Sequence, residues 1–245
     1  MNIKKMLTIF TLPIMWLIYI IFELISGRLN DIATLIFNIG IIVIFALVGL
    51  VIYLIGIRFE SGVPNKLIPT FFVGITLIDQ VVKILIKFFY FDRHFYLIPN
   101  LLSFHPIINT NGSWLNARFN TNVSFAFLIG VNIAALLIFL ELYRYYIFNG
   151  YKDFWSDMCF IFIFSGSFCS LIDKVFYGGS LDFIGISNLF IADIKDIYIN
   201  IGILFLVLTI FNNDSLNTET ETTFKEDLES LKKFLFFIKR DITKK

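Results

Sequence analysis

Three aspartates are the side chains of this sequence best placed to do chemistry together. Asp173 ends one apolar run, Asp182 follows in Ser-Leu-Asp-Phe-Ile, and Asp193 opens the next apolar run in Leu-Phe-Ile-Ala-Asp. Two carboxylates at close range share a proton, because both cannot ionise cheaply. One can then act as general base on a water molecule while the other donates a proton to a carbonyl oxygen. Such a pair would hydrolyse a peptide bond without a metal ion or a covalent nucleophile.

Each of these carboxylates also has an ordinary interpretation when it is taken alone. A helix N-terminus favours acidic residues, so Asp193 could serve as a cap. Asp182 falls in a segment outside the apolar runs, where a solvated carboxylate is common. The hypothesis of a catalytic pair therefore depends on the two being brought together.

A second pair of charges, Asp79 and Lys83, lies inside an apolar run that reads Leu-Ile-Asp-Gln-Val-Val-Lys. The i,i+4 spacing puts both side chains on one face of a helix, where they can pair. A charge near the bilayer centre costs about 2.5–3.5 kcal/mol, so it persists only with a partner or a function. We expect the pair to face the protein interior, as a structural ion pair or as part of a site. Gln80 is expected to donate a hydrogen bond between packed helices.

Other hydrolytic chemistries have little support in the sequence. There are 2 histidines and no His-Glu-x-x-His, which excludes zinc membrane proteases of that type. The segment Ser165-Gly166-Ser167 lacks the Gly-x-Ser-Gly of rhomboid-type serine proteases, and Tyr177-Gly178-Gly179-Ser180 is not the Gly-x-Gly-Asp of other membrane aspartyl proteases. A serine–lysine dyad using Lys83 stays open, although no serine has a diagnostic context. No metal or other cofactor is expected.

The composition indicates that membrane helices hold these residues. Of the 245 residues, 58% are hydrophobic and 16% are charged, whereas a soluble domain is nearer half apolar and a quarter charged. Because about twenty apolar residues span a bilayer, we expect an all-α integral membrane protein with about six spanning helices and a small loop region outside the membrane. The net charge of +1 gives no indication of nucleic acid as a partner, and none is expected. The predicted spans are Met6–Ile25, Ala33–Ile57, Leu67–Phe91, Val123–Phe148, Phe154–Leu171 and Ile191–Phe211.

Basic residues predict the orientation of these spans. Lysines and arginines concentrate before the first span, in the second and fourth loops and in the tail, which puts both termini in the cytoplasm. The long third loop, from Asp92 to Asn122, then lies outside, and a loop of that length is uncommon without a function. The basic residues assigned to the outer side are fewer: Arg28, Arg93, Arg118, Lys174 and Lys195.

The tail divides into a polar linker, Asn212 to Thr223, and an amphipathic helix, Phe224 to Arg240. Its predicted apolar stripe is Phe224, Leu228, Leu231, Leu235 and Ile238. Charged residues interrupt this helix too often for it to span, so we expect it to lie on the cytoplasmic membrane surface, with its lysines near anionic headgroups. Docking to a partner protein is the alternative.

In their order and placement, these motifs resemble those of the lipoprotein signal peptidases (signal peptidase II). The family pattern consists of Asp-Gln-x-x-Lys, an outer Asn-Thr-Gly segment, a Gly-rich helix ending in Asn-x-x-Asp-Arg, Val-Val-Asp-Phe-Ile, and Phe-Asn-x-Ala-Asp. Ser170 and Lys174 stand where the family has Asn and Arg. The matching residues are Asp79, Gln80, Lys83, Asn109, Asn111, Gly112, Gly166, Asp173, Asp182, Ala192 and Asp193.

The resemblance implies an aspartyl endopeptidase that removes signal peptides from prolipoproteins carrying diacylglycerol on cysteine, near the outer face of the cell membrane. Asp182 and Asp193 fall at the positions of the family's catalytic pair. The supporting or substrate-binding positions are Asp79, Lys83, Asn109, Asn111, Gly166, Asp173 and Lys174. Prolipoproteins and membrane lipids are the implied partners. The implied organisation is two extra spans in residues 1–66, a peptidase core of four helices in residues 67–211, and a cytoplasmic tail in residues 212–245.

Two other functions are compatible with the same residues. A catalytically inactive relative would keep the fold and the charges and bind lipoproteins or lipids. A transporter or channel component would use the intramembrane charges to conduct ions, although no second matching half of the chain supports it. Cleavage of a lipid-modified precursor separates the peptidase from both.

Overall fold

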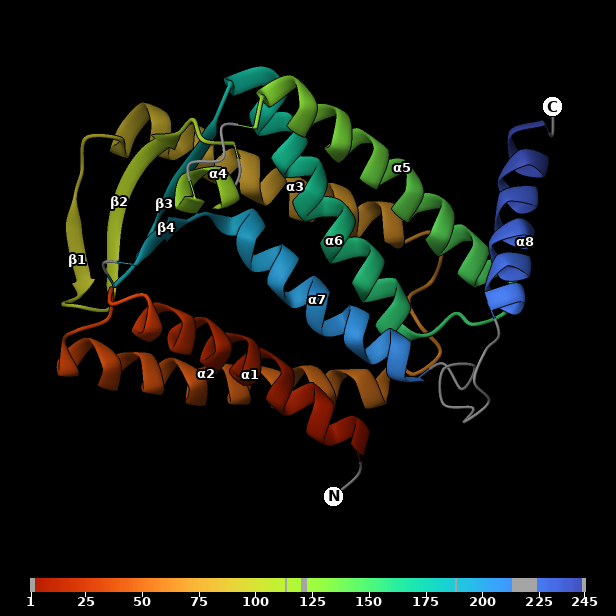
Figure 1. Ribbon diagram of the computed structural model, residues 1–245, viewed down its shortest axis with the longest axis horizontal. Helices are drawn as coiled ribbons and strands as arrows, with labels where there is room; N and C mark the ends of the chain where they lie inside the picture. Colours follow the sequence, from red (N-terminus) through yellow and green to blue (C-terminus); the bar gives the residue numbers. More distant parts are fainter. Residues whose placement is uncertain (1–2, 113, 120–122, 188, 213–223, 244–245) are drawn as a thin grey trace.

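The computed structural model describes residues 3–112, 114–119, 123–187, 189–212 and 224–243. Long helices run side by side, a small sheet lies at one end of the bundle, and the C-terminal helix lies at the other end (Figure 1). The mostly helical architecture expected from the composition is confirmed. The helices are α1 Ile3–Ile25, α2 Ile32–Arg58, α3 Ile68–Leu85 with the π-helical turn Ile86–Tyr90, α4 Trp114–Phe119, α5 Phe125–Phe148, α6 Phe154–Ile172 with the π-helical turn Asp173–Tyr177, α7 Ile194–Asn212 and α8 Phe224–Thr243.

Local sequence explains where several helices begin. The Asp31 carboxylate accepts a hydrogen bond from the Thr34 backbone N–H at 2.8 Å and caps α2. At the start of α6, Asp153 and Ser156 form a reciprocal capping box. These side chains satisfy backbone N–H groups that have no partner within the first helical turn.

In the described part of the chain, five helices are long and apolar enough to cross a membrane: α1, α2, α5, α6 with its π turn, and α7. The remaining predicted span, Leu67–Phe91, is also helical, but its helix α3 is not among the five. It is 18 residues long and carries Asp79 and Lys83 in its second half. On α2 and α5, apolar side chains such as Ile44 and Leu137 are exposed by more than half, as expected of surfaces that face lipid.

The centre of the bundle is the contact between α6 and α7. Trp155, Leu204 and Leu208 are almost fully buried there. The two helices approach so closely that a Cβ atom added to Gly166 would lie 2.7 Å from Ile199 Cγ1. Small residues at such interfaces let membrane helices pack tightly, and here Gly166 brings the start of α7 against the end of α6.

The segments expected outside the membrane pair into a four-stranded antiparallel sheet. Its strands are β1 Phe95–Ile98, β2 Leu102–Asn109, β3 Ser180–Ile186 and β4 Phe190–Ala192, in that spatial order. The central pair aligns Asn109 with Ser180 and Ile107 with Asp182. Its register shifts between Phe104 and Ile107, around Pro106, which has no N–H to donate. The sheet therefore brings the third loop beside the segment that carries Asp182.

The two N-terminal helices hold the turn between β3 and β4. Asn38 Nδ2 of α2 donates to Ser187 Oγ at 3.2 Å, and the Arg28 guanidinium donates to the Leu189 carbonyl oxygen. The Tyr19 ring of α1 stands edge-on to the Phe190 ring, with centroids 5.3 Å apart. Since this turn connects Asp182 to Asp193, the first two helices brace the hairpin on which both aspartates depend.

A buried carboxylate on α1 ties the same helices to α4. Glu23 is fully buried and lies 3.4 Å from Arg28 Nη1 and 3.5 Å from Arg118 Nη2, where Arg118 belongs to α4. A buried charge persists when it is paired in this way.

The tail forms the expected helix, but its packed face differs from the predicted stripe. Phe237 is the residue buried against the end of α5, with its ring centroid 5.3 Å from that of Tyr145 and 5.2 Å from that of Phe148. Leu228, Leu231 and Leu235 of the predicted stripe remain exposed. The helix therefore packs on α5 through another face, and its expected contact with the membrane surface stays a prediction. The first linker residue, Asn212, ends α7, whereas residues 213–223 and the side chain of Phe224 lie outside the described part of the chain.

Replacing both arginines, Arg28→Met with Arg118→Met, is expected to lower the free energy of unfolding by about 3–5 kcal/mol, because Glu23 becomes a buried charge without compensation. Thermal unfolding of the purified protein in detergent measures this. Adding Glu23→Gln should restore most of the loss, since it removes the charge. A triple variant no more stable than the double variant would contradict this explanation.

Candidate active site

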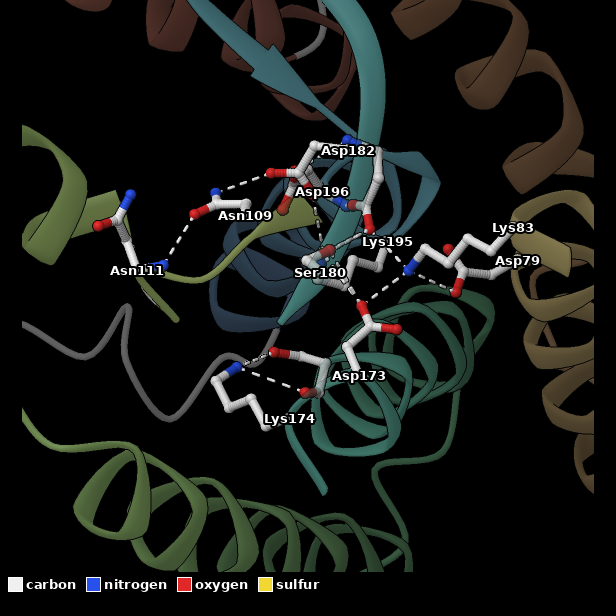
Figure 2. Close-up of polar contacts among 12 residues, drawn as sticks. Asp79, Lys83, Asn109, Asn111, Asp173, Lys174, Ser180, Asp182, Lys195 and Asp196 are labelled. Atoms are coloured by element: carbon white, nitrogen blue, oxygen red, sulfur yellow. Dashed lines mark hydrogen bonds and ion pairs between the residues drawn. The ribbon is translucent and has the colours of Figure 1, made fainter. Parts of the chain in front are cut away.

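Four carboxylates and two ammonium groups meet where the ends of three helices approach the sheet (Figure 2). Asp79 and Lys83 come from α3, Asp173 from the π turn after α6, Asp182 from β3, and Asp193 and Lys195 from the start of α7. Each is at least nine-tenths buried. The cluster lies at the sheet end of the bundle, away from α8 (Figure 1).

Lys83 joins three of these carboxylates. Its Nζ lies 2.9 Å from Asp79 Oδ2, 2.8 Å from Asp173 Oδ2 and 2.7 Å from Asp193 Oδ2. The i,i+4 pair on α3 forms and faces the interior, with both residues buried. Gln80 does not bridge helices as expected, because its Nε2 donates to the neighbouring Asp79 Oδ2 at 3.0 Å.

Lys195 is the site residue that the sequence analysis missed. It was counted among the cations of the outer side, but its ammonium points into the cluster. Its Nζ contacts Asp193 Oδ2 directly, lies 3.3 Å from Asp173 Oδ2 and 3.8 Å from Asp182 Oδ1, and donates to Ser180 Oγ at 2.5 Å. A sequence signal did exist: a lysine in the first turn of a helix opposes the helix dipole, so its presence there indicates an acidic partner.

The two oxygens of Asp193 have different partners. Oδ1 accepts from the Asp196 backbone N–H at 3.3 Å, while Asp196 Oδ2 accepts from the Asp193 backbone N–H at 3.1 Å. This reciprocal arrangement caps α7 and fixes the plane of the carboxylate. Oδ2 is left to face Lys83, Lys195 and the Ser180 hydroxyl, which donates to it at 3.0 Å. The capping role and the candidate catalytic role are therefore compatible.

Asp182 is oriented by an amide from the neighbouring strand. Asn109 Nδ2 donates to Asp182 Oδ2 at 2.8 Å, and Asn109 Oδ1 accepts from the Asn111 backbone N–H at 3.1 Å. Asp182 Oδ1 is buried and makes no hydrogen bond within the described part of the chain. This oxygen is thus available to a reacting group.

Burial and the lysines give the two aspartates opposite electrostatic character. Burial raises the pKa of Asp182 above its usual range, and the Asp193 carboxylate adds to this effect. Burial also disfavours ionisation of Asp193, but the ammonium groups of Lys195 and Lys83 outweigh it and hold the pKa of Asp193 below its usual range. Pairs of carboxyl groups with pKa values pushed apart are typical of acid–base catalysis.

Three of the expected supporting residues lie at the margin of the cluster. The Asn111 side chain points away from Asp182 (Figure 2), so of the two candidate asparagines Asn109 is the one at the carboxylate. The Lys174 ammonium lies apart from the carboxylates and contacts Ser170 Oγ. At both of these positions the sequence departs from the family pattern, and here the two residues pair with each other. Gly166 serves the packing of α6 on α7.

Comparisons with known proteins agree on one family. The model of the signal peptidase (SPase) II family matches residues 71–212. A lipoprotein signal peptidase from Microcystis aeruginosa is 27% identical over 143 residues, which cover 57% of this chain and 88% of that protein. Another from Wigglesworthia glossinidia brevipalpis is 35% identical over 88 residues, covering 34% of this chain and 58% of that protein.

Two solved structures of a bacterial membrane enzyme, determined by the in meso method at 2.3 and 1.9 Å, share the fold. Each has a TM-score of 0.51; the first is 20% identical and covers 67% of this chain and 99% of its own, and the second is 19% identical and covers 63% and 97%. The apolar helices define a multi-pass membrane protein, and the family model and the relatives place it in the protease class. The chain belongs to the signal peptidase II family.

Lys83→Met is expected to destabilise the protein strongly, because three buried carboxylates lose their shared cation. Removal of one member of a buried ion pair costs about 3–5 kcal/mol. Thermal unfolding in detergent tests this, with Lys87→Met as a matched control, since Lys87 is exposed and rests on the Tyr177 ring. Equal stability of the two variants would contradict the role assigned to Lys83.

Proposed function

We propose that this protein is an aspartyl endopeptidase that removes the signal peptides of diacylglyceryl-modified prolipoproteins, with Asp182 and Asp193 as its catalytic residues. The observation that carries the proposal is the buried pair itself: one ammonium, that of Lys195, contacts both carboxylates. Their pKa values are shifted in opposite directions. The names of the relatives support the prolipoprotein substrate.

The opposite shifts suggest a role for each carboxyl group. Asp193 is ionised and takes a proton from water, whose oxygen attacks the carbonyl carbon of the scissile bond. Protonated Asp182 gives its proton to the carbonyl oxygen, which yields a neutral gem-diol. Asp193 then returns a proton to the leaving nitrogen as the C–N bond breaks, and Asp182 recovers its proton from the gem-diol. The sequence of steps restores both residues.

The supporting residues have separate tasks in this proposal. Asn109 holds the plane of Asp182 and offers an amide to the substrate backbone, since an amide both donates and accepts. Lys83, Asp79 and Asp173 keep Asp193 in place. Lys174 and Asn111, at the margin of the cluster, would contact the substrate rather than the reacting atoms. Gly166 keeps α7 against α6.

Orientation follows from the positions of the termini and of the site. Lys4 Nζ donates to Asn212 Oδ1 at 3.1 Å, so the start of α1 and the end of α7 are at the same end of the bundle. Basic residues concentrate there and in α8, which favours the cytoplasmic side. The sheet and the carboxylates then lie near the outer face, where a lipid-modified cysteine would be held.

Membrane lipids are proposed as partners of the tail. A cavity of about 490 Å³ lies between α5 and α8, with Phe148, Phe236 and Phe237 among its walls and Lys232, Lys233 and Arg240 beside them. Aromatic walls and three cations suit an anionic lipid at the cytoplasmic surface.

A serine–lysine hydrolase is the second candidate, because Lys195 donates to Ser180 Oγ at 2.5 Å. Lysine acts as a base only when it is neutral. Here Asp173, Asp182 and Asp193 all lie within 4 Å of the ammonium and stabilise its charged form. The Ser180 hydroxyl also donates to carboxylates. This environment favours the aspartyl mechanism over the serine mechanism.

Asp182→Asn and Asp193→Asn are each expected to abolish cleavage of a lipid-modified precursor. Ser180→Ala should keep at least about a tenth of the parent rate, because the hydrogen bond that it removes contributes only about 0.5–1.5 kcal/mol. Product formation by gel shift or mass spectrometry measures all three variants. The serine mechanism predicts the reverse order. An inactive relative predicts no cleavage by the parent protein.

Truncation after Asn212 should leave peptidase activity in place, because α8 lies at the end of the bundle opposite the carboxylates (Figure 1). Binding to vesicles of anionic lipid by the separate peptide of residues 224–243 would support its surface role. Complete loss of activity in a well-inserted truncated protein would mean that the tail or the site has been misplaced.

A further inference from the structure

Lys195 is a buried charge of the cluster that lies outside the residues of the family pattern. It lies in the first turn of α7, two residues after Asp193. A cation there faces the positive end of the helix dipole and loses solvation on burial. Its side chain is nevertheless only 9% exposed. Interactions within the site must offset both costs.

Those interactions single out Lys195 among the cations of the site. Lys83 contacts Asp193, Asp79 and Asp173. Lys195 contacts Asp193 and also lies 3.8 Å from Asp182. Among the described residues, it is the one ammonium within 4 Å of both proposed catalytic carboxylates.

The balance of charge around Asp182 and Asp193 makes their contact with Lys195 important for which of them carries a proton. The ionisable groups packed around the pair are Asp79 and Lys83 of α3, Asp173 and Lys174 after α6, Asp182 of β3, and Asp193, Lys195 and Asp196 at α7. Buried carboxylates outnumber the ammonium groups that contact them, which favours retention of a proton on at least one carboxyl group of the cluster. Among the paired carboxylates of the cluster, Asp182 lies farthest from an ammonium, at 3.8 Å, and like Asp79 it has one such contact.

The position of Lys195 is held firmly by the backbone. A Cβ atom on Gly166 would lie 3.1 Å from the Lys195 carbonyl oxygen, so the first turn of α7 rests directly on α6. The cap between Asp193 and Asp196 closes the same turn. The backbone of Lys195 is thus fixed beside α6, and the ion pairs with Asp182 and Asp193 hold its ammonium between the two carboxylates.

We propose that Lys195 is a positioning residue of this site: its ammonium, held between Asp182 and Asp193, makes Asp193 the carboxylate that accepts a proton and Asp182 the carboxyl group that donates one. The catalytic consequence of this arrangement rests on the proposed function, whereas the effect of Lys195 on the protonation of the two carboxyl groups does not. Lowering of the pKa of Asp193 by the two lysines agrees with it.

Titration of the aspartate carboxyl groups tests the proposal directly. The full-length protein, labelled with carbon-13 at the aspartate carboxyl carbons and held in detergent micelles, is followed by NMR from pH 3 to 8, and Asp193→Asn assigns the signal. In Lys195→Met, the midpoint for Asp193 should rise by about 1–3 pH units, the effect of losing an opposite charge at this range. Lys195→Arg should restore it, and Lys87→Met, an exposed lysine at the same end of the bundle, should leave it unchanged.

The pH profile of kcat/KM for a lipid-modified precursor gives a second readout. Its acid limb should move to higher pH in Lys195→Met by the same amount as the NMR midpoint. An unchanged Asp193 midpoint in folded Lys195→Met would overturn the proposal, whatever the activity. A shifted midpoint in a protein that cleaves nothing would support the proposal and count against the proposed peptidase function. Faster cleavage by Lys195→Met at every pH would also overturn the proposal, because it would show that the ammonium obstructs the site.

Discussion

The pairing of buried carboxylates with two buried lysines constrains the rest of this structure. Burial of a carboxylate without a partner costs several kcal/mol, and here Lys83 and Lys195 together contact Asp79, Asp173, Asp182 and Asp193. Because these charges must pair, α3, α6 and α7 pack in the arrangement that brings their charged residues together. Gly166 permits that approach, and the π-helical turn at Asp173 presents its carboxylate at the end of α6. Such turns are frequent at functional sites.

The elements outside this core serve the same cluster from a distance. Pairing of β2 with β3 puts Asn109 beside Asp182, and α1 and α2 hold the turn that leads from Asp182 to Asp193. The two extra helices thus form contacts with the hairpin of the site and are not an independent unit beside it. The opposite end of the bundle carries α8 and its basic residues (Figure 1).

The periodicity of apolar residues and the spacing of charged ones predicted the features that depend on residues close together in the chain. The apolar runs gave the long helices, and the i,i+4 spacing of Asp79 and Lys83 gave a pair that forms at 2.9 Å. The sheet depends on contacts between residues 102–109 and 180–186, which no local pattern encodes, since the segments looked like polar loops. Lys195 was overlooked because positive-inside counting treats a lysine at a helix start as a loop charge. The face of α8 depends on α5, so its packing could not be read from the tail alone. The catalytic roles of Asp182 and Asp193 stay predictions.

The most direct test of the peptidase proposal is mass spectrometry of the products that the purified full-length protein releases from a synthetic prolipoprotein peptide with diacylglycerol on its cysteine, incubated in oxygen-18 water. The account predicts one product that begins with the lipidated cysteine and a second whose new carboxylate contains a single oxygen-18 atom, because water is the nucleophile. Recovery of the intact peptide under conditions where the protein is folded would contradict it.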